Sequence, residues 1–136
     1  MTSPQIVCMN AAVPIELIPI ERPGIPSAPG SPREYGSVDF VSSDHGFAAG
    51  IWQGEAGVIS IAGYPVDEFC LILEGEVILT SKDGARQTFT PGMSFIVPRG
   101  FEGTWEMPVR SKKYFASHGT AQMVALLLGS AASAVA

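Results

Sequence analysis

Turn signals divide the middle of the chain into short segments. Breaks such as Lys82-Asp83-Gly84, Pro91-Gly92 and Pro98-Arg99-Gly100 recur at intervals of roughly eight to ten residues. The segments between them are rich in β-branched and aromatic residues, which suit a pleated strand. Many short strands with closely spaced turns are typical of a sandwich or barrel, so the sequence predicts an all-β fold. The expected strands are 37–42, 47–53, 57–62, 68–73, 76–81, 86–90, 93–97, 103–107 and 112–117.

The two ends of the chain differ from this middle part. Most of the eleven prolines precede Tyr35, and proline disrupts a helix interior. We therefore expect residues 1–35 to form an extended, proline-rich arm, residues 36–118 the barrel, and residues 119–136 a partly frayed C-terminal segment. The apolar stretch Val13–Ile20 could dock as an edge strand, where proline is tolerated; a free leader is the alternative. The stretch 120–129 could be a helix or a last strand.

Composition excludes several classes of partner. The formal net charge is −5, and basic residues gather only at Arg110, Lys112 and Lys113. Nucleic acid, which needs a basic face, is therefore not expected as a partner. No apolar tract approaches the length of a membrane span, and the N-terminus lacks the pattern of a signal peptide. Two cysteines are too few for a disulfide scaffold. These features predict a cytoplasmic protein without a membrane partner.

Two short motifs carry a resemblance to a known superfamily. The stretch Glu68–Gly75 matches the end of the pattern G-x5-H-x-H-x(3,4)-E-x6-G, and Gly92–Gly103 matches G-x5-P-x-G-x2-H in its Gly and Pro positions. These patterns are typical of cupins, so the chain resembles the cupin superfamily. The resemblance implies a single antiparallel jelly-roll β-barrel made of two sheets. The shared glycines and proline belong to turns and support the fold rather than an activity.

A closer resemblance covers roughly residues 47 to 116. It rests on Gly50–Trp52, Asp67–Gly75, Pro98–Glu106 and Lys112–Tyr114 in combination. This combination is similar to a branch of small cupins related to ureidoglycine aminohydrolases and ethanolamine-utilisation cupins. The chain departs from that branch at Met93, where the branch usually has an aspartate.

The histidines of the cupin motifs are missing. The paired histidines should fall near Ala62 and Tyr64, and the third at Gly103, so that only Glu68 remains of the usual ligand set. A divalent transition metal needs several converging ligands. The departure from the cupin ligand set therefore implies a barrel without a metal and without a cofactor.

Glu68 is the first candidate for a functional residue. It lies in the strand 68–73, which is otherwise apolar on both faces and which we therefore expect to be covered on both sides. An unpaired buried carboxylate is costly. Glu68 could act as a general base or bind a ligand, with its pKa raised by burial. The alternative is a structural carboxylate paired with Lys112 or Lys113.

Aromatic residues and a glycine supply candidate ligand contacts. Trp105 lies two positions beyond Gly103 and shares its face, and the missing side chain at Gly103 could leave room for a ligand. Trp105 and Trp52 could form an aromatic wall, or both could belong to the core.

The remaining candidates carry polar groups. The hydroxyl of Tyr64 could supply a hydrogen bond or a proton in place of an imidazole, although its place between Gly63 and Pro65 also suits a loop rim. Lys112 and Tyr114 share a strand face and could orient a carboxylate substrate or pair with Glu68. An exposed edge charge is the alternative for Lys112.

The sequence thus predicts a metal-independent cupin that binds a small polar metabolite, nitrogen-bearing or carboxylate, in its barrel. Proton transfer by Glu68, Tyr64 and Lys112 would suit an isomerase, a lyase or an aminohydrolase. A non-catalytic sensor or accessory subunit is the alternative, and a metalloenzyme with an atypical ligand set, drawing on His45 and His118, is a weaker one. We also expect a homodimer, because the arm adds apolar surface.

Overall fold

The computed structural model describes residues 3–11, 18–22 and 30–134. The nine predicted strands are confirmed as β2–β10, with small shifts at their ends, and a short β1 precedes them. The elements are β1 (Ile18–Pro19), β2 (Glu34–Val41), β3 (Phe47–Gly54), β4 (Gly57–Ala62), β5 (Asp67–Glu74), β6 (Val77–Ser81), β7 (Arg86–Phe89), β8 (Ser94–Val97), β9 (Glu102–Met107), β10 (Ser111–His118), helix α1 (Ala121–Leu128) and the 3-10 helix η1 (Gly129–Ala134).

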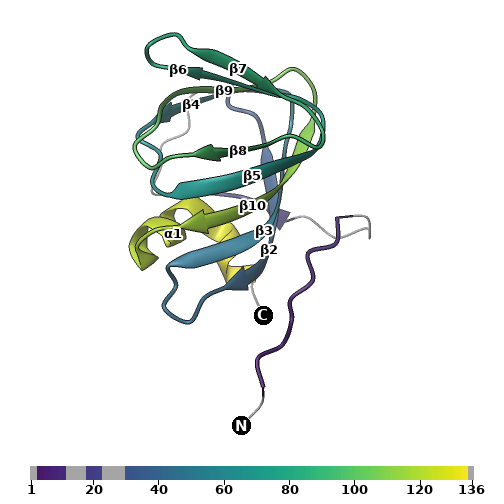
Figure 1. The fold of residues 1–136 in the computed structure, drawn as a ribbon, viewed down its shortest axis with the longest axis vertical. Coiled ribbons are helices and arrows are strands. Elements are labelled where there is room, and N and C mark those ends of the chain that lie inside the picture. Colours follow the sequence, from purple (N-terminus) through teal and green to yellow (C-terminus); the bar gives the residue numbers. More distant parts are fainter. Residues whose placement is uncertain (1–2, 12–17, 23–29, 135–136) are drawn as a thin grey trace.

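The strands form two antiparallel sheets that enclose the core. One sheet has the order β1-β2-β3-β10-β5-β8, and the other has the order β4-β9-β6-β7. Figure 1 shows the second sheet above the first, with α1 beside the β3 and β10 end of the first sheet. This arrangement confirms the predicted jelly-roll barrel.

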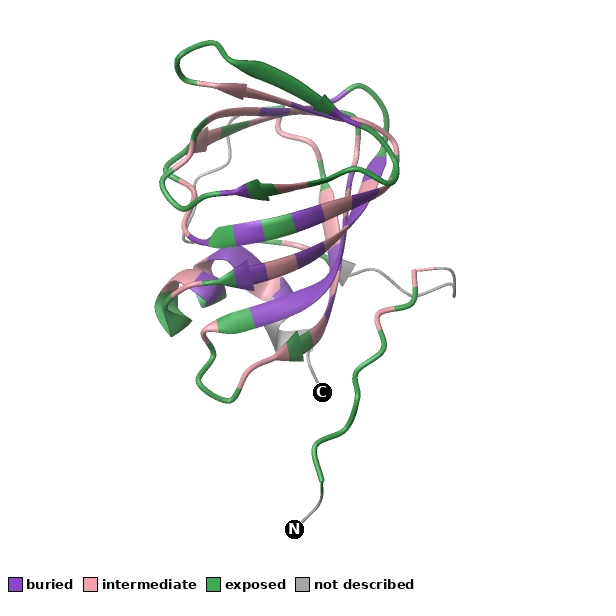
Figure 2. Cartoon of the chain, viewed as in Figure 1, coloured by how far each residue is buried: buried purple, intermediate pink, exposed green. Residues whose placement is uncertain are grey.

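Side chains alternate between the barrel interior and its outer surface. Along β10 every second residue is buried, beginning with Ser111 and ending with Ser117. Along β5, Glu68, Cys70 and Ile72 point inward and are buried (Figure 2). The expectation that this strand is covered on both sides was wrong, because Phe69 on its outer face is 44% exposed.

Helix α1 resolves the ambiguity of residues 120–129. The Thr120 hydroxyl caps its first turn by accepting a hydrogen bond from the Met123 amide, and Gly129 ends it with a positive φ. Its apolar face packs into the core through Val124 and Leu127. The 3-10 helix η1 follows α1 directly and buries Ala131, so the tail is not frayed at its start, contrary to the prediction.

Ala11 and the strand β1 of the N-terminal segment contact the barrel. The strand β1 pairs with β2 at the edge of the larger sheet, and the Ala11 amide donates a hydrogen bond to the Tyr114 hydroxyl. The rest of the predicted edge strand, residues 13–17, lies outside the described residues. Within the part of the chain that is described, no helix is long and apolar enough to cross a membrane.

Candidate functional site

A buried ion pair lies inside the barrel. Glu68 on β5 is 3% exposed and Lys113 on β10 is 5% exposed. The Lys113 ammonium donates a hydrogen bond of 2.9 Å to Glu68 Oε2. Charged groups are rarely buried this completely unless they are paired, so each side chain accounts for the burial of the other.

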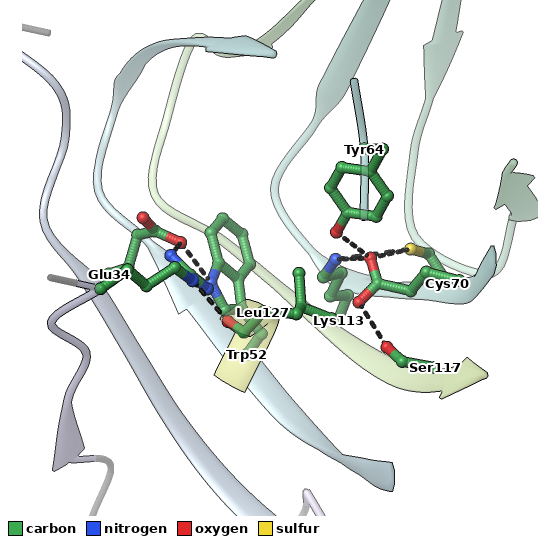
Figure 3. A network of polar contacts seen from close by, with 9 residues as sticks. Glu34, Trp52, Tyr64, Cys70, Lys113, Ser117 and Leu127 are labelled. Atoms are coloured by element: carbon green, nitrogen blue, oxygen red, sulfur yellow. Dashed lines mark hydrogen bonds and ion pairs between the residues drawn. The ribbon is translucent and has the colours of Figure 1, made fainter. Parts of the chain in front are cut away.

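Three further donors surround the same carboxylate. The Tyr64 hydroxyl donates to Oε2 at 2.7 Å, and the Cys70 thiol lies 3.4 Å from the same oxygen. The Ser117 hydroxyl donates to Oε1 at 3.1 Å. In Figure 3 the side chains of these residues converge between β5 and β10. The register explains this meeting, because Ser117 lies directly opposite Glu68 on the neighbouring strand.

The pair is charged at neutral pH. Burial alone would raise the pKa of Glu68, but the Lys113 charge and the hydrogen bonds from Lys113, Tyr64 and Cys70 outweigh burial and lower it. Burial likewise opposes the charge on Lys113, whereas Cys70 and Glu68 raise its pKa above the ordinary value. The predicted upward shift for Glu68 was therefore wrong, because the prediction considered burial without the lysine. Burial also raises the pKa of Tyr64 and of Cys70, so both keep their protons.

Two indole rings flank the ammonium. Lys113 Nζ lies 4.5 Å from the ring centroid of Trp105 and 5.0 Å from that of Trp52. The two rings meet edge to face with centroids 5.7 Å apart. Both belong to the buried core cluster, and their role as the wall of a ligand pocket stays a prediction. Cation–π attraction of this kind stabilises a desolvated ammonium.

The two indole nitrogens differ in their partners. Trp52 Nε1 donates to Glu34 Oε1 at 2.9 Å, and Arg22 pairs with that same oxygen (Figure 3). Arg22 also donates to the Leu127 carbonyl at the end of α1, where a cation is favourable to the helix dipole. Trp105 Nε1, in contrast, is buried and has no hydrogen-bond partner among the described residues. An unpaired buried donor is costly, so Trp105 has a hydrogen bond to offer to an acceptor other than the described residues.

The structure corrects the choice of lysine. Lys112 and Tyr114 alternate with Lys113 on β10, so they face outward and do not meet Glu68. Tyr114 instead accepts the hydrogen bond from Ala11. Each face of this strand carries one lysine and one aromatic residue, and alternation alone could not identify the inner face.

The predicted space beside Gly103 is also absent. A Cβ built on Gly103 would lie 2.0 Å from the Thr80 carbonyl oxygen and 3.0 Å from the Phe101 ring. Strands β9 and β6 are paired at this point. Glycine is therefore needed for the close approach of two backbones, and the position leaves no room for a ligand.

The residues around Glu68 do not fit a metal ion. Its two oxygens already accept hydrogen bonds, and a fixed positive charge lies 2.9 Å away. Within the described residues, no group of three or more His, Cys, Asp or Glu side chains could hold a metal. Of the two lost histidine positions near β5, Tyr64 now donates to Glu68, and Ala62 is exposed at the end of β4. Lys113 thus provides the positive charge beside the carboxylate.

The fold and its enclosed polar cluster define a protein of the cupin superfamily. The family model of the EutQ-like cupin domain matches residues 41–115, and the chain belongs to this family. No curated protein matches the chain.

Solved structures support the same fold. The EutQ protein of Clostridium difficile aligns with a TM-score of 0.60 at 14% identity, covering 71% of this chain and 75% of that one. A DUF861-family protein of unknown function from Pseudomonas syringae aligns with a TM-score of 0.65 at 21% identity, covering 76% of this chain but only 44% of that one. A putative ethanolamine utilization protein Q from Salmonella typhimurium has a TM-score of 0.56 at 18% identity, with coverage of 63% and 69%. At these identities the likeness shows the fold alone, and the resemblance to ureidoglycine aminohydrolases stays a prediction.

Proposed function

We propose that this cupin binds a small molecule through a carboxylate or carbonyl oxygen, using a lysine instead of a metal as the positive charge. The unpartnered Nε1 of Trp105, buried beside the Lys113 ammonium, is the observation that carries the proposal. The ammonium carries three protons, and its described hydrogen bonds go to Glu68 and Cys70. An anionic or carbonyl oxygen that accepts from the indole would also be attracted by the nearby ammonium charge.

Access to the cluster depends on a side chain that reaches the surface. Tyr64 is half-buried, and its hydroxyl contacts Glu68. Its backbone is tied to the loop of Phe101 by hydrogen bonds in both directions, from the Tyr64 amide to Phe101 and from Gly100 to the Tyr64 carbonyl. Movement of this tyrosine would admit a small ligand without unfolding a strand.

Calorimetric titration tests the proposal with benzoate and benzamide as probes, which share a shape but differ in charge. Benzoate is expected to bind more tightly than benzamide. Trp105→Phe keeps the ring but removes the free donor, and a hydrogen bond to a charged group contributes about 1.5–3 kcal/mol, so affinity should fall roughly tenfold or more. Trp52→Phe is the matched control, because the Nε1 of that indole is already engaged by Glu34. Equal losses in both variants, or a stoichiometric metal in the purified protein, would refute the proposal. Equal binding of both probes would refute the preference for a charged oxygen.

A second function, proton transfer, is favoured by the hydrogen bond between Tyr64 and Glu68. With Lys113 bound to it, Glu68 is a weak base. A ligand oxygen that drew the ammonium away would raise the pKa of Glu68 and let it accept a proton, with Tyr64 as the link toward solvent. A Glu68→Gln variant that folds and binds the ligand but loses turnover would support proton transfer by Glu68. Unchanged turnover would show that Glu68 is not the base.

A second copy of the chain is the partner that we propose for the outer surface of β5 and β8. Phe69 and Ile96 lie opposite each other on these strands and are 44% and 64% exposed. A cross-strand apolar pair exposed on a sheet face favours association.

A further inference from the structure

A cleft of about 170 Å³ lies beside the charged cluster. Its lining is largely aromatic and aliphatic and comes from β6, β7, β8 and the loop before β9. Phe89, Phe95 and Phe101 belong to the lining, and the rings of Phe89 and Phe95 stack with centroids 4.1 Å apart. We infer that this cleft is a subsite for a planar, ring-sized group, and that the ligand of this cupin is therefore a small ring-bearing carboxylate. The inference rests on the proposed function, because the carboxylate is the group that Lys113 and Trp105 would bind.

The cleft and the cluster share walls. Val97 of the cleft lies directly opposite Glu68, and Phe95 lies opposite Cys70. Neighbouring strands are about 4.8 Å apart, so the backbone of Val97 is about one strand spacing from the backbone of Glu68. On the other sheet, Leu79 of the cleft lies opposite Trp105. Trp105, whose ring contacts the ammonium, is thus the cross-strand neighbour of a residue that lines the cleft.

The Phe95 ring separates the two halves of the site. Its centroid is 4.1 Å from the Phe89 ring and 5.8 Å from the Trp105 ring. Phe95 is only half-buried, whereas its neighbours Cys70 and Trp105 are buried. Rotation of this ring would connect the cleft to the cluster and let one molecule occupy both. A ring in the cleft would then place a directly attached carboxylate toward Trp105.

The size and lining of the cleft select the class of ligand. A cavity of about 150 Å³ lined by apolar side chains is large enough to bind benzene. The cleft is of that size, and most of its lining side chains are apolar. Binding sites for small molecules commonly combine such an apolar pocket with a few polar groups that fix orientation. An aliphatic acid too short to enter the cleft would use only the polar half.

Titration of the intact chain with acetate and benzoate tests the subsite. Both probes carry the same charged group, so the proposed function predicts that both bind, and the subsite predicts at least a tenfold preference for benzoate. Ala85 is an exposed residue at the rim of the cleft. Ala85→Phe should fill the cleft and remove the preference while leaving acetate binding unchanged. Ala56→Phe, at an exposed turn between β3 and β4, is the matched control and should retain the preference.

The outcomes separate the two proposals. Equal affinities for acetate and benzoate, or a preference that survives Ala85→Phe, would overturn the subsite and leave the proposed function in place. Binding of benzamide as tightly as benzoate, with the preference lost in Ala85→Phe, would support the cleft but refute the charge contact. Failure of both acids to bind would refute both proposals.

Discussion

Removal of one partner of the Glu68–Lys113 pair is expected to destabilise the barrel more than removal of both. At a separation of 2.9 Å and an effective dielectric constant of 20, the Coulomb attraction is about 6 kcal/mol. Taking both ions out of water costs several kcal/mol each. The two contributions nearly cancel, so the intact pair adds little net stability. Removal of only one partner lowers stability strongly, because the other charge stays buried without a partner.

The variants Glu68→Gln and Lys113→Met separate these contributions. Each alone leaves an uncompensated buried group and should lower the free energy of unfolding by about 3–5 kcal/mol. Independent effects would add to about 6–10 kcal/mol in the double variant. We expect instead that the double variant is more stable than either single variant, because neither charge remains.

Urea unfolding at pH 7, followed by circular dichroism, measures these differences. Domains of this size are stable by about 5–15 kcal/mol, so the single variants should remain partly or fully folded. Lys112→Met is the matched control, since Lys112 lies on the outer face of the same strand and its loss should change stability by less than about 0.5 kcal/mol. Additive losses in the double variant, or a loss in Lys112→Met as large as in Lys113→Met, would refute the reasoning.

Three other predictions concern pH, backbone packing and association. The stability that the pair contributes, measured as the difference from the double variant, should be constant between about pH 5 and 10. It should fall as pH drops through the lowered pKa of Glu68, below 4.5, and as pH rises through the raised pKa of Lys113, above 10.5; a difference that changes near pH 7 would contradict this. Gly103→Ala should lower the free energy of unfolding by about 1–3 kcal/mol or more in urea melts. Gly92→Ala, also at a positive φ but with open space around it, should cost less, and equal costs would exclude a role for the clash. Light scattering at micromolar concentration should show a dimer that Phe69→Lys weakens, and a monomeric parent chain would refute the interface.

The fold could be predicted because its signals are local. Each strand is bounded by Gly, Pro or Asp residues that form turns without help from distant parts of the chain. Residues 121–128 were ambiguous, because a short apolar run satisfies both the helical and the strand period. The Thr120 cap was the available sign of a helix.

The candidate site was only partly predictable, because it depends on contacts between strands. Glu68 stood out as a carboxylate in an apolar strand. The choice between Lys112 and Lys113 as its partner stayed open, since the inner face of β10 is set by its pairing with β5, which places Ser117 opposite Glu68. The sequence also does not show which residues of other strands lie beside Glu68 and Gly103. The pKa of Glu68 depends on Lys113, and the space beside Gly103 depends on β6, so both predictions were wrong.

The character of the groups around Glu68 explains why they do not fit a metal ion. Metal ligands must present lone pairs toward a common point. Around this carboxylate, the hydroxyls of Tyr64 and Ser117, the Cys70 thiol and the Lys113 ammonium all present protons. A shell of donors stabilises a carboxylate but would repel a second cation. In the proposed function, the positive charge is carried by a tethered side chain, and its exchange between Glu68 and a ligand oxygen would require rotation of bonds and not loss of an ion. Ligand binding should accordingly be unchanged after treatment with a chelator, and a titration in which chelation abolished binding would show that the lysine does not carry this role.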